Sequence, residues 1–437
     1  MKTYLLVLMT AVLVLAPAAH AEHIIAKGEL LTLERSIEIA LKMHPSILAG
    51  HGAVDVNRAR KGQAESAYYP QIDANAGYTR FQPSTISTGT TTIGIRRVQE
   101  SNSFEQYNTS ISARQTIFDF GKTWTNVNIQ KLNIEASQAD LANTEEQVIL
   151  NVKQAYYNLL RARANRVVAE ETIKQFEQHL GQAKAFYEVG TKPKFDVTKA
   201  EVDLSTVKLS QISAENAVRI AQVSLNNAMG VPDAPEYVID SKLSFEKYQI
   251  TVDEAMEKAY ANRPELKSIL AKKKASEEAI ALAKKGYYPV LTGNADWTWA
   301  GEGGNFATGD GWNAGVGLTI PIFSGFLTKN QVSEAKANLV ILTASEESLR
   351  QTVLLEVQQN LLNLGEAEER ISTAKLTVQQ AQENYEIASG RYAAGVGNPI
   401  EVTDAEVALA NAKTSYIQAM YDFKVARASL EKAMGTR

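Results

Sequence analysis

The sequence contains no cysteine. This absence excludes disulfides, thiolate nucleophiles, cysteine-ligated zinc or iron–sulfur clusters, and a lipid on an N-terminal cysteine. Histidine is scarce, with five residues in 437, and no two are four apart, the spacing of a helical metal site. The P-loop, HExxH and GxSxG signatures are missing as well. We therefore predict a protein that is not an enzyme and has no cofactor, no metal site and no catalytic residues.

A surplus of basic charge is missing too. The chain has 45 Lys and Arg residues against 49 acidic ones, a net charge of −4, which argues against nucleic acid as a partner. An apolar run follows Lys2, and it ends at Pro17 and the small-x-small motif Ala19-His20-Ala21. It predicts a secretory signal peptide over residues 1–21. No later segment has 18 consecutive apolar residues, so a passage through a membrane would have to use β-strands.

The sequence carries a tandem duplication. Seven landmarks return in the same order, which exceeds chance for helical sequence. Tyr68-Tyr69-Pro70 returns as Tyr287-Tyr288-Pro289, an offset of 219 (287 − 68), and Gly190 returns as Gly395, an offset of 205 (395 − 190). The smaller offset implies an insert in the first copy, which we place at the Ser-, Thr- and Gly-rich residues 82–103. We predict a first structural repeat over residues 22–230, a linker over 231–249 and a second repeat over 250–437.

The positions of proline indicate very long helices. No proline lies between Pro83 and Pro193 or between Pro321 and Pro399, and proline breaks helix interiors. We expect helices over 124–187 and 330–392, each roughly 65 residues or about 95 Å long at 1.5 Å per residue. Such lengths, and an apolar seam in each copy with steps of four and three, indicate coiled-coil packing. The seam residues are Ala200, Leu204, Val207, Gln211, Ala214, Val218, Ala221, Leu225 and Ala228, and Ala405, Leu409, Ala412, Tyr416, Ala419, Phe423, Ala426, Leu430 and Ala433.

Four segments of about ten residues alternate apolar and polar side chains, in predicted strand hairpins over about 71–116 and 290–320. Ten residues cross a bilayer as a tilted strand, and alternation with terminal aromatics is typical of outer-membrane barrels. A soluble, one-sided sheet on a helical core would show the same alternation. The aromatic residues expected at the membrane interface are Tyr78, Tyr107, Trp297, Trp299 and Trp312.

Four strands cannot close a barrel that has a lumen. Open strand edges in lipid would leave backbone groups unpaired, each at a cost of several kcal/mol. The sequence therefore predicts a symmetric oligomer whose total strand number is a multiple of four. We expect residues 301–304, which read Gly-Glu-Gly-Gly, to form an extracellular loop rather than a nucleotide site, because they do not open a helix.

Several motifs together resemble the TolC family of outer membrane efflux proteins. They are the duplication, the Tyr-Tyr-Pro landmark before a strand hairpin, residues 321–325 (Pro-Ile-Phe-Ser-Gly) after one, and Arg391-Tyr392 with Gly395 at a helix turn. The resemblance covers Leu31 to Gly435. It implies a mainly α fold with a β-barrel part: a homotrimer with a 12-stranded barrel in the outer membrane lipid and a long α-barrel of coiled-coil helices crossing the periplasm.

The resemblance also implies a function. Family members are exit ducts of tripartite efflux pumps or type I secretion systems, and they work with a periplasmic adaptor (membrane fusion) protein and an inner-membrane transporter. Whether small molecules or proteins are the cargo is left open. The rival hypothesis is a periplasmic coiled-coil scaffold or surface structural protein without a pore, which would need no aromatic-flanked strands.

By the same resemblance, the turns between the long helices lie at the periplasmic tip. The turn residues expected to dock the adaptor are Gly190, Thr191, Lys192, Gly395, Val396 and Gly397. Relatives place carboxylates at positions matching Asp196, Glu401 and Asp404, as rings that narrow the entrance, and rings of acids select cations. The alternative is that these are solvated acids favoured near a helix N-terminus. Arg391 and Tyr392 resemble a latch between helices, although a cation in the last helical turn also serves as a cap.

Overall fold

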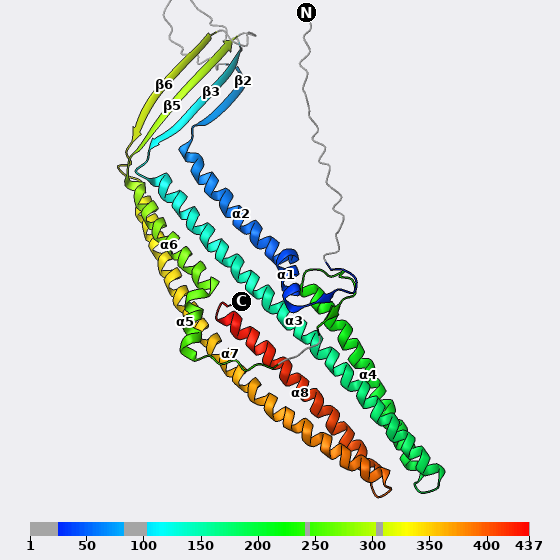
Figure 1. Ribbon diagram of the computed structural model, residues 1–437. Coiled ribbons are helices and arrows are strands. Elements are labelled where there is room, and N and C mark those ends of the chain that lie inside the picture. The colour runs from blue at the N-terminus through cyan, green and yellow to red at the C-terminus, as the bar shows by residue number, and fades with distance from the viewer. Residues whose placement is uncertain (1–24, 83–102, 241–244, 303–308, 437) are drawn as a thin grey trace, which may run out of the picture. The chain divides into compact units, whose positions relative to one another are not determined.

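The computed structural model describes residues 25–82, 103–240, 245–302 and 309–436 (Figure 1). The predicted signal peptide and residues 83–102 of the predicted insert lie outside the described residues. In chain order the elements are β1 (Leu30–Leu31), α1 (Leu33–Met43), α2 (Pro45–Glu65), η1 (Ser66–Tyr68), β2 (Gln71–Phe81), β3 (Phe104–Phe118), α3 (Lys122–Glu188), α4 (Lys194–Ala228), β4 (Val238–Ile239), α5 (Val252–Asn262), α6 (Pro264–Lys284), η2 (Lys285–Tyr287), β5 (Val290–Glu302), β6 (Gly309–Thr319), α7 (Leu327–Ala393) and α8 (Pro399–Ala433).

The helices occur in two series of equal lengths. α1 and α5 have 11 residues each, α2 and α6 have 21, α3 and α7 have 67, and α4 and α8 have 35. The two predicted helices of roughly 65 residues are therefore confirmed, and each ends a few residues before Pro193 or Pro399, as the proline argument requires. The shorter pair shares its start signal, because Thr32 and Thr251 both accept a hydrogen bond at the helix N-cap.

The described residues fall into two compact units, and each unit takes segments from both sequence copies. The first contains the described residues within 1–44, 151–246 and 371–422, and the second contains those within 45–150, 247–370 and 423–437. In the first unit, the predicted seam of α8 is buried at Ala405, Leu409 and Ala419. The seam of α4 is buried at its two ends, at Ala200 and Leu204 and again at Ala221 and Leu225, and is half-buried between them.

The predicted linker is not a simple connector. It contains β4, which pairs in parallel with β1, so that Leu30 lies opposite Val238 and Leu31 opposite Ile239. The neighbouring Tyr237 is buried, and its hydroxyl donates a 2.8 Å hydrogen bond to Asn226 Oδ1. A two-residue strand has no periodicity to read, which is why the sequence did not predict it. The prediction that 301–304 form a loop is also wrong in part, because β5 continues through Gly301 and Glu302.

The second unit contains a four-stranded antiparallel sheet in the order β2-β3-β5-β6. All four predicted strands are confirmed, and the central pair joins the two sequence copies through β3 and β5. The register places Trp297 opposite Ile111 on one side and Trp312 on the other. β2 and β6 are the two edges of this sheet. In the described part of the chain, no helix is both long enough and apolar enough to span a membrane.

Candidate functional site: a two-faced sheet and a helical tip

One face of the sheet carries all five aromatic residues predicted from the sequence. Tyr78 lies opposite Tyr107 with ring centroids 5.3 Å apart, and Trp297 lies opposite Trp312. Trp299 is on the same face because it is two residues from Trp297, and the two rings stack at 5.8 Å. This face is solvent-exposed in the single chain, and Trp312 is 73% exposed. An exposed aromatic and apolar surface of this kind marks an interaction with lipid or protein.

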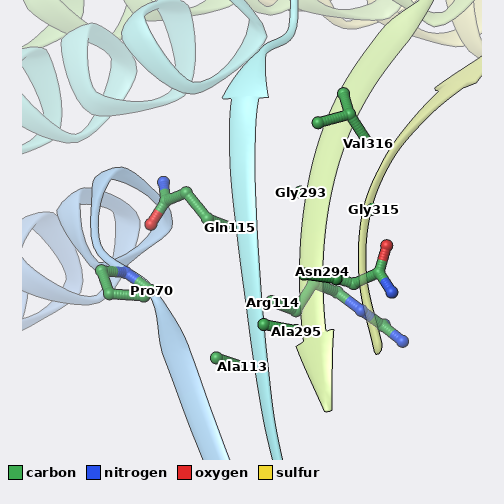
Figure 2. Close-up of a pocket in the computed structure, with 10 residues that line it drawn as sticks. Pro70, Ala113, Arg114, Gln115, Gly293, Asn294, Ala295, Gly315 and Val316 are labelled. Atoms are coloured by element: carbon green, nitrogen blue, oxygen red, sulfur yellow. The ribbon is translucent and has the colours of Figure 1, made fainter. Parts of the chain in front are cut away.

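The other face of the same strands is polar. The register aligns Asp73, Ser112, Asp296 and Asn313 in one row across the sheet. Figure 2 shows the next row, in which the side chains of Arg114 and Asn294 extend beside Gly315. A shallow hollow of about 440 Å³ lies at this part of the sheet, and its lining includes Arg114, Asn294 and Gly315 of the polar face together with residues of the aromatic face such as Gly293 and Val316. In the middle of the sheet the strands therefore separate apolar from charged side chains, whereas Arg80, Glu105 and Asp310 lie on the aromatic face near the ends of the strands.

A second aromatic group, which was not predicted from the sequence, lies at the end of the sheet nearest the helices. The rings of Phe118 and Phe120 are 4.7 Å apart, and Phe120 stacks on Tyr288 at 5.4 Å. Phe323 and Phe326 form an edge-to-face pair at 5.5 Å. A signal was present in the sequence, since Phe-x-Phe-Gly begins at Phe118, the last residue of β3, and Phe-x-Gly-Phe begins at Phe323, four residues after the end of β6 (323 − 319).

The outer members of the first aromatic group, Tyr78 and Tyr107, are separated from the second group by about the thickness of a membrane. Tyr107 and Phe118 are 11 residues apart on β3 (118 − 107), which is about 36 Å along a strand at 3.3 Å per residue. A strand tilt of about 40° reduces this to roughly 28 Å along the membrane normal, close to the apolar band of about 25 Å in outer-membrane barrels.

The two turns between long helices lie together in the first unit. Lys192, in the α3–α4 turn, donates a 3.3 Å hydrogen bond from Nζ to the Gly397 carbonyl in the α7–α8 turn, and it also lies 5.8 Å from the centre of the Tyr392 ring. Gly190 and Gly395 have φ of 77° and 80°, the left-handed conformation that ends helices. The structure thus brings the six predicted turn residues to one place, at one end of the long helices (Figure 1).

The three predicted acids lie in different environments. Glu401 is exposed, and its Oε2 is 3.4 Å from Arg391 Nη1. Asp404 is also exposed, whereas Asp196 is only 5% exposed. Asp196 and Glu401 are counterparts in the duplicated sequence, 205 residues apart (401 − 196), but in the structure Asp196 is buried and Glu401 is exposed. Asp196 therefore does not share the free, water-facing position of the other two acids.

Arg391 and Tyr392 also differ from each other. The Arg391 guanidinium pairs with Glu401 and so connects α7 to α8. Tyr392 is fully buried among Ala388, Val402 and Ala405, and its hydroxyl has no hydrogen-bond partner among the described residues. Burial and the negative charge of Asp196 raise the pKa of this hydroxyl. Within one chain, Arg391 thus joins α7 to α8 through an exposed ion pair, and Tyr392 contributes packing rather than a polar link.

Two buried ionisable residues near these turns were not predicted. His179 on α3 contacts the Tyr392 ring at 4.9 Å, and burial lowers its pKa. Glu406 on α8 is fully buried, and burial with the nearby charge of Asp203 raises its pKa to about 8. The sequence did contain a signal for Glu406, because it lies four residues after Val402 and three before Leu409, on the apolar side of α8.

Comparison with known proteins agrees with this geometry. The sequence matches the family described as Outer membrane efflux protein over residues 36–231 and 255–436. It is 24% identical to the outer membrane protein TolC of Escherichia coli K12 over 389 residues, covering 86% of this chain and 76% of TolC. It is 23% identical to the outer membrane efflux protein BepC of Brucella suis, covering 92% and 85% of the two chains. The solved structure of CusC superposes with a TM-score of 0.79 at 16% identity, covering 94% of this chain and 95% of that one.

The chain belongs to the outer membrane efflux protein family. This is a family of transport channels and not of enzymes, and the fold is that of the TolC-type channels. The protein is accordingly an efflux exit duct of the outer membrane that extends into the periplasm. The family match does not support the rival hypothesis of a scaffold without a pore.

Proposed function

We propose that three copies of this chain close into a 12-stranded barrel in the outer membrane, and that the long helices form the periplasmic part of a tripartite efflux pump. The observation that carries this proposal is the two-faced sheet with two edges, β2 and β6. Unpaired strand edges are not tolerated in lipid. Pairing β6 of each copy with β2 of the next satisfies every edge and turns the row of Asp73 and Asp296 toward a water-filled lumen.

The long helices also indicate assembly, because they expose apolar surface in the single chain. Large apolar side chains remain exposed along α4 and α7 in the single chain, at spacings that place them in stripes. On α4 they are Val202, Leu209, Ile212, Ile220 and Val223, and on α7 they are Val340, Ile341, Leu355, Leu362, Leu376 and Ile387. Monomers seldom expose stripes of this kind. We expect them to be covered by helices of the neighbouring copies, which would close the α-barrel.

Purification in detergent tests this proposal. We expect light scattering to give the mass of a trimer, and planar bilayers to show channels after the purified protein is added. A monomer that forms no channel would contradict the proposal. The same trimer is the species to which a periplasmic adaptor would bind at the α3–α4 and α7–α8 turns, and an inner-membrane transporter would complete the pump.

At the tip, Glu401 and Asp404 are the proposed constriction acids. They are exposed, three residues apart, and so share one side of α8. Threefold symmetry would place six carboxylates around the axis, which favours cations and hinders anions. The combined variant Glu401→Ala, Asp404→Ala should lose most of the cation preference, so that its permeability ratio in bilayers moves toward unity.

The matched control is Glu383→Ala, which removes an exposed acid of α7 away from the turn and should leave ion selectivity unchanged. Because Glu401 is partly neutralised by Arg391, we expect Asp404→Ala alone to have a larger effect than Glu401→Ala alone. Unchanged selectivity in the combined variant would show that these acids are solvated helix-start residues and not a filter.

A further inference from the structure

Three buried side chains near the α3–α4 and α7–α8 turns carry polar atoms without a hydrogen-bond partner among the described residues. They are His179 on α3, Tyr392 on α7 and Glu406 on α8, none more than 3% exposed. Among the described residues, His179 Nδ1, the Tyr392 hydroxyl and both carboxyl oxygens of Glu406 have no partner. Buried polar groups are paired in the great majority of cases. Three side chains with unpartnered buried atoms, on helices that meet near the same turns, therefore indicate a functional role.

Glu406 is the most unusual of the three, because no described residue donates a hydrogen bond to its carboxyl group or supplies a compensating positive charge. The charged group that acts on it from α4 is Asp203, another acid. The nearby cation Lys199 is already held by Asp203, with Nζ 2.7 Å from both carboxylate oxygens, and Thr403 donates to the same carboxylate at 3.2 Å.

Among the described residues, α3 and α7 supply no positive charge that acts on Glu406 either. From α7, Tyr385 is the titratable group on which the charge of Glu406 acts. From α3, His179 is held in its neutral form by burial, with Asp196, Lys199 and Asp203 as the charges acting on it. An ionised carboxylate without a partner is very costly in such a place. The packed tip therefore requires a neutral Glu406.

We propose that Glu406 is a proton-binding group that controls the packing of the tip: the neutral carboxyl allows α8 to pack against α4 and α7, and its ionisation separates them. An ionised carboxylate needs water, and water can reach both oxygens only if the helices around it move apart. The inference rests on the proposed function, in which this tip is the entrance of the duct. No group of three metal-ligating side chains lies in the described ranges, which favours a proton over a metal ion as the ligand.

The duplicated sequence provides an internal comparison. Glu201 is the counterpart of Glu406 in the first copy (406 − 205), and it is exposed, with an oxygen 3.3 Å from Lys184 Nζ. Likewise Tyr187, the counterpart of Tyr392 (392 − 205), is 46% exposed, whereas Tyr392 is fully buried. The same residue types therefore occur in both copies, but only those of the second copy are enclosed.

The direction of the pH effect follows from where the proton binds more tightly. The packed tip holds the pKa of Glu406 at about 8, whereas in an opened, hydrated tip it would return to that of an ordinary carboxyl group, about 4.3. The packed form is thus fully favoured below the lower of these two values. It loses that advantage as the pH rises toward 8, above which the carboxyl is ionised in both forms.

The central variant is Glu406→Gln, which keeps the shape of the neutral carboxyl but cannot ionise, with Glu201→Gln as the matched control. We would compare hydrogen exchange of the backbone amides of residues 402–409 in the purified proteins, variant against wild type at each pH from 4 to 9. At about pH 4, where the carboxyl is protonated in both forms, the three proteins should agree. At pH 9 the wild type and Glu201→Gln should exchange faster than Glu406→Gln, by about tenfold or more.

Two further measurements keep the inference falsifiable. The infrared band of a protonated carboxyl group should be present in the wild type at pH 7 and lost in Glu406→Gln and in Glu406→Met, and a band that persists in both would overturn the proposal. His179→Asn, which copies the counterpart residue Asn384 (179 + 205), should keep the wild-type pH response. Loss of that response would assign the switch to the histidine and overturn the role of Glu406.

Failure of this inference and failure of the proposed function would look different. If bilayers show channels but the backbone amides of Glu406→Gln exchange at the wild-type rate at pH 9, the proposed function is supported and the proton switch is contradicted. If no channel forms at any pH, the proposed function falls, while the exchange and infrared measurements, which need no channel, still decide the protonation of Glu406.

Discussion

Replacing Gly397 with alanine is expected to disrupt the α7–α8 turn at a cost of about 1–3 kcal/mol. A Cβ atom at this position would lie 2.6 Å from the backbone nitrogen of Tyr392 and 2.9 Å from the carbonyl carbon of Arg391. The backbone cannot yield easily, because the amides of Val396 and Gly397 both donate to the Arg391 carbonyl, at 3.1 and 3.0 Å. Since Arg391 also pairs with Glu401, the turn and the proposed constriction should loosen together.

The effect is measurable as faster hydrogen exchange across residues 388–402 and as altered channel conductance. The matched control is Gly190→Ala in the other turn, where φ is 77° but no atom lies within 4 Å of the added Cβ. That variant should pay only the left-handed backbone cost of roughly 1–2 kcal/mol and leave the α7–α8 turn intact. If each variant speeds hydrogen exchange only in its own turn, and both do so to the same degree, then the close backbone contact at Gly397 adds nothing to the cost of the substitution.

Replacing Trp297 with arginine is expected to prevent or strongly weaken membrane assembly. Trp297 lies on the aromatic face, opposite Ile111 and Trp312. The register puts Trp297 level with Ile111, four residues from Tyr107 (111 − 107) and seven from Phe118 (118 − 111), so it lies inside the span between these aromatic residues and not at its edge. If that face meets lipid, an arginine there costs up to about 2–4 kcal/mol, the figure for the bilayer midplane. A trimer contains the substitution three times, so the total cost is three times larger. The measurement is the fraction of trimer in the outer membrane, together with the urea midpoint of the purified protein in lipid vesicles.

The control is the adjacent residue on the other face. Thr298 lies opposite Ser110 and Gly311 in the polar rows of the sheet. Because successive side chains of a strand point to opposite faces, Thr298→Arg should place its charge in water and leave assembly nearly unchanged. Equal damage from both substitutions would indicate a sheet packed on both faces, as in a soluble protein, and would contradict the proposed barrel.

The β4 strand and the second aromatic group show where prediction from sequence was incomplete. β4 depends on its partner β1, more than 200 residues away, and a pairing of two residues leaves no local pattern. Phe120 and Phe326 adopt φ of 55° and 64°, which bulky residues rarely do. Their position at the strand–helix junction was visible in the sequence, but their clustering with Phe118, Phe323 and Tyr288 required the folded chain.

The sequence by itself determined the elements of this protein and their order. Proline-free stretches and helix-forming composition produce helices of 67 residues, and strict alternation produces strands with one apolar face, because both patterns act through local backbone and side-chain geometry. The duplication is likewise a property of the sequence alone, and from it one would expect residues 205 positions apart, such as Asp196 and Glu401, to be equally buried.

Only the tertiary structure decided which member of each matched pair is buried. Asp196 is enclosed and Glu401 is exposed, whereas Glu406 is enclosed and Glu201 is exposed. A helix presents the same side chains in both copies, but their environment depends on which helices pack against it, and those neighbours come from distant segments of the chain. The cost of burying a charge depends on that environment, and this is why the proposed proton switch is found at Glu406 and not at its sequence counterpart.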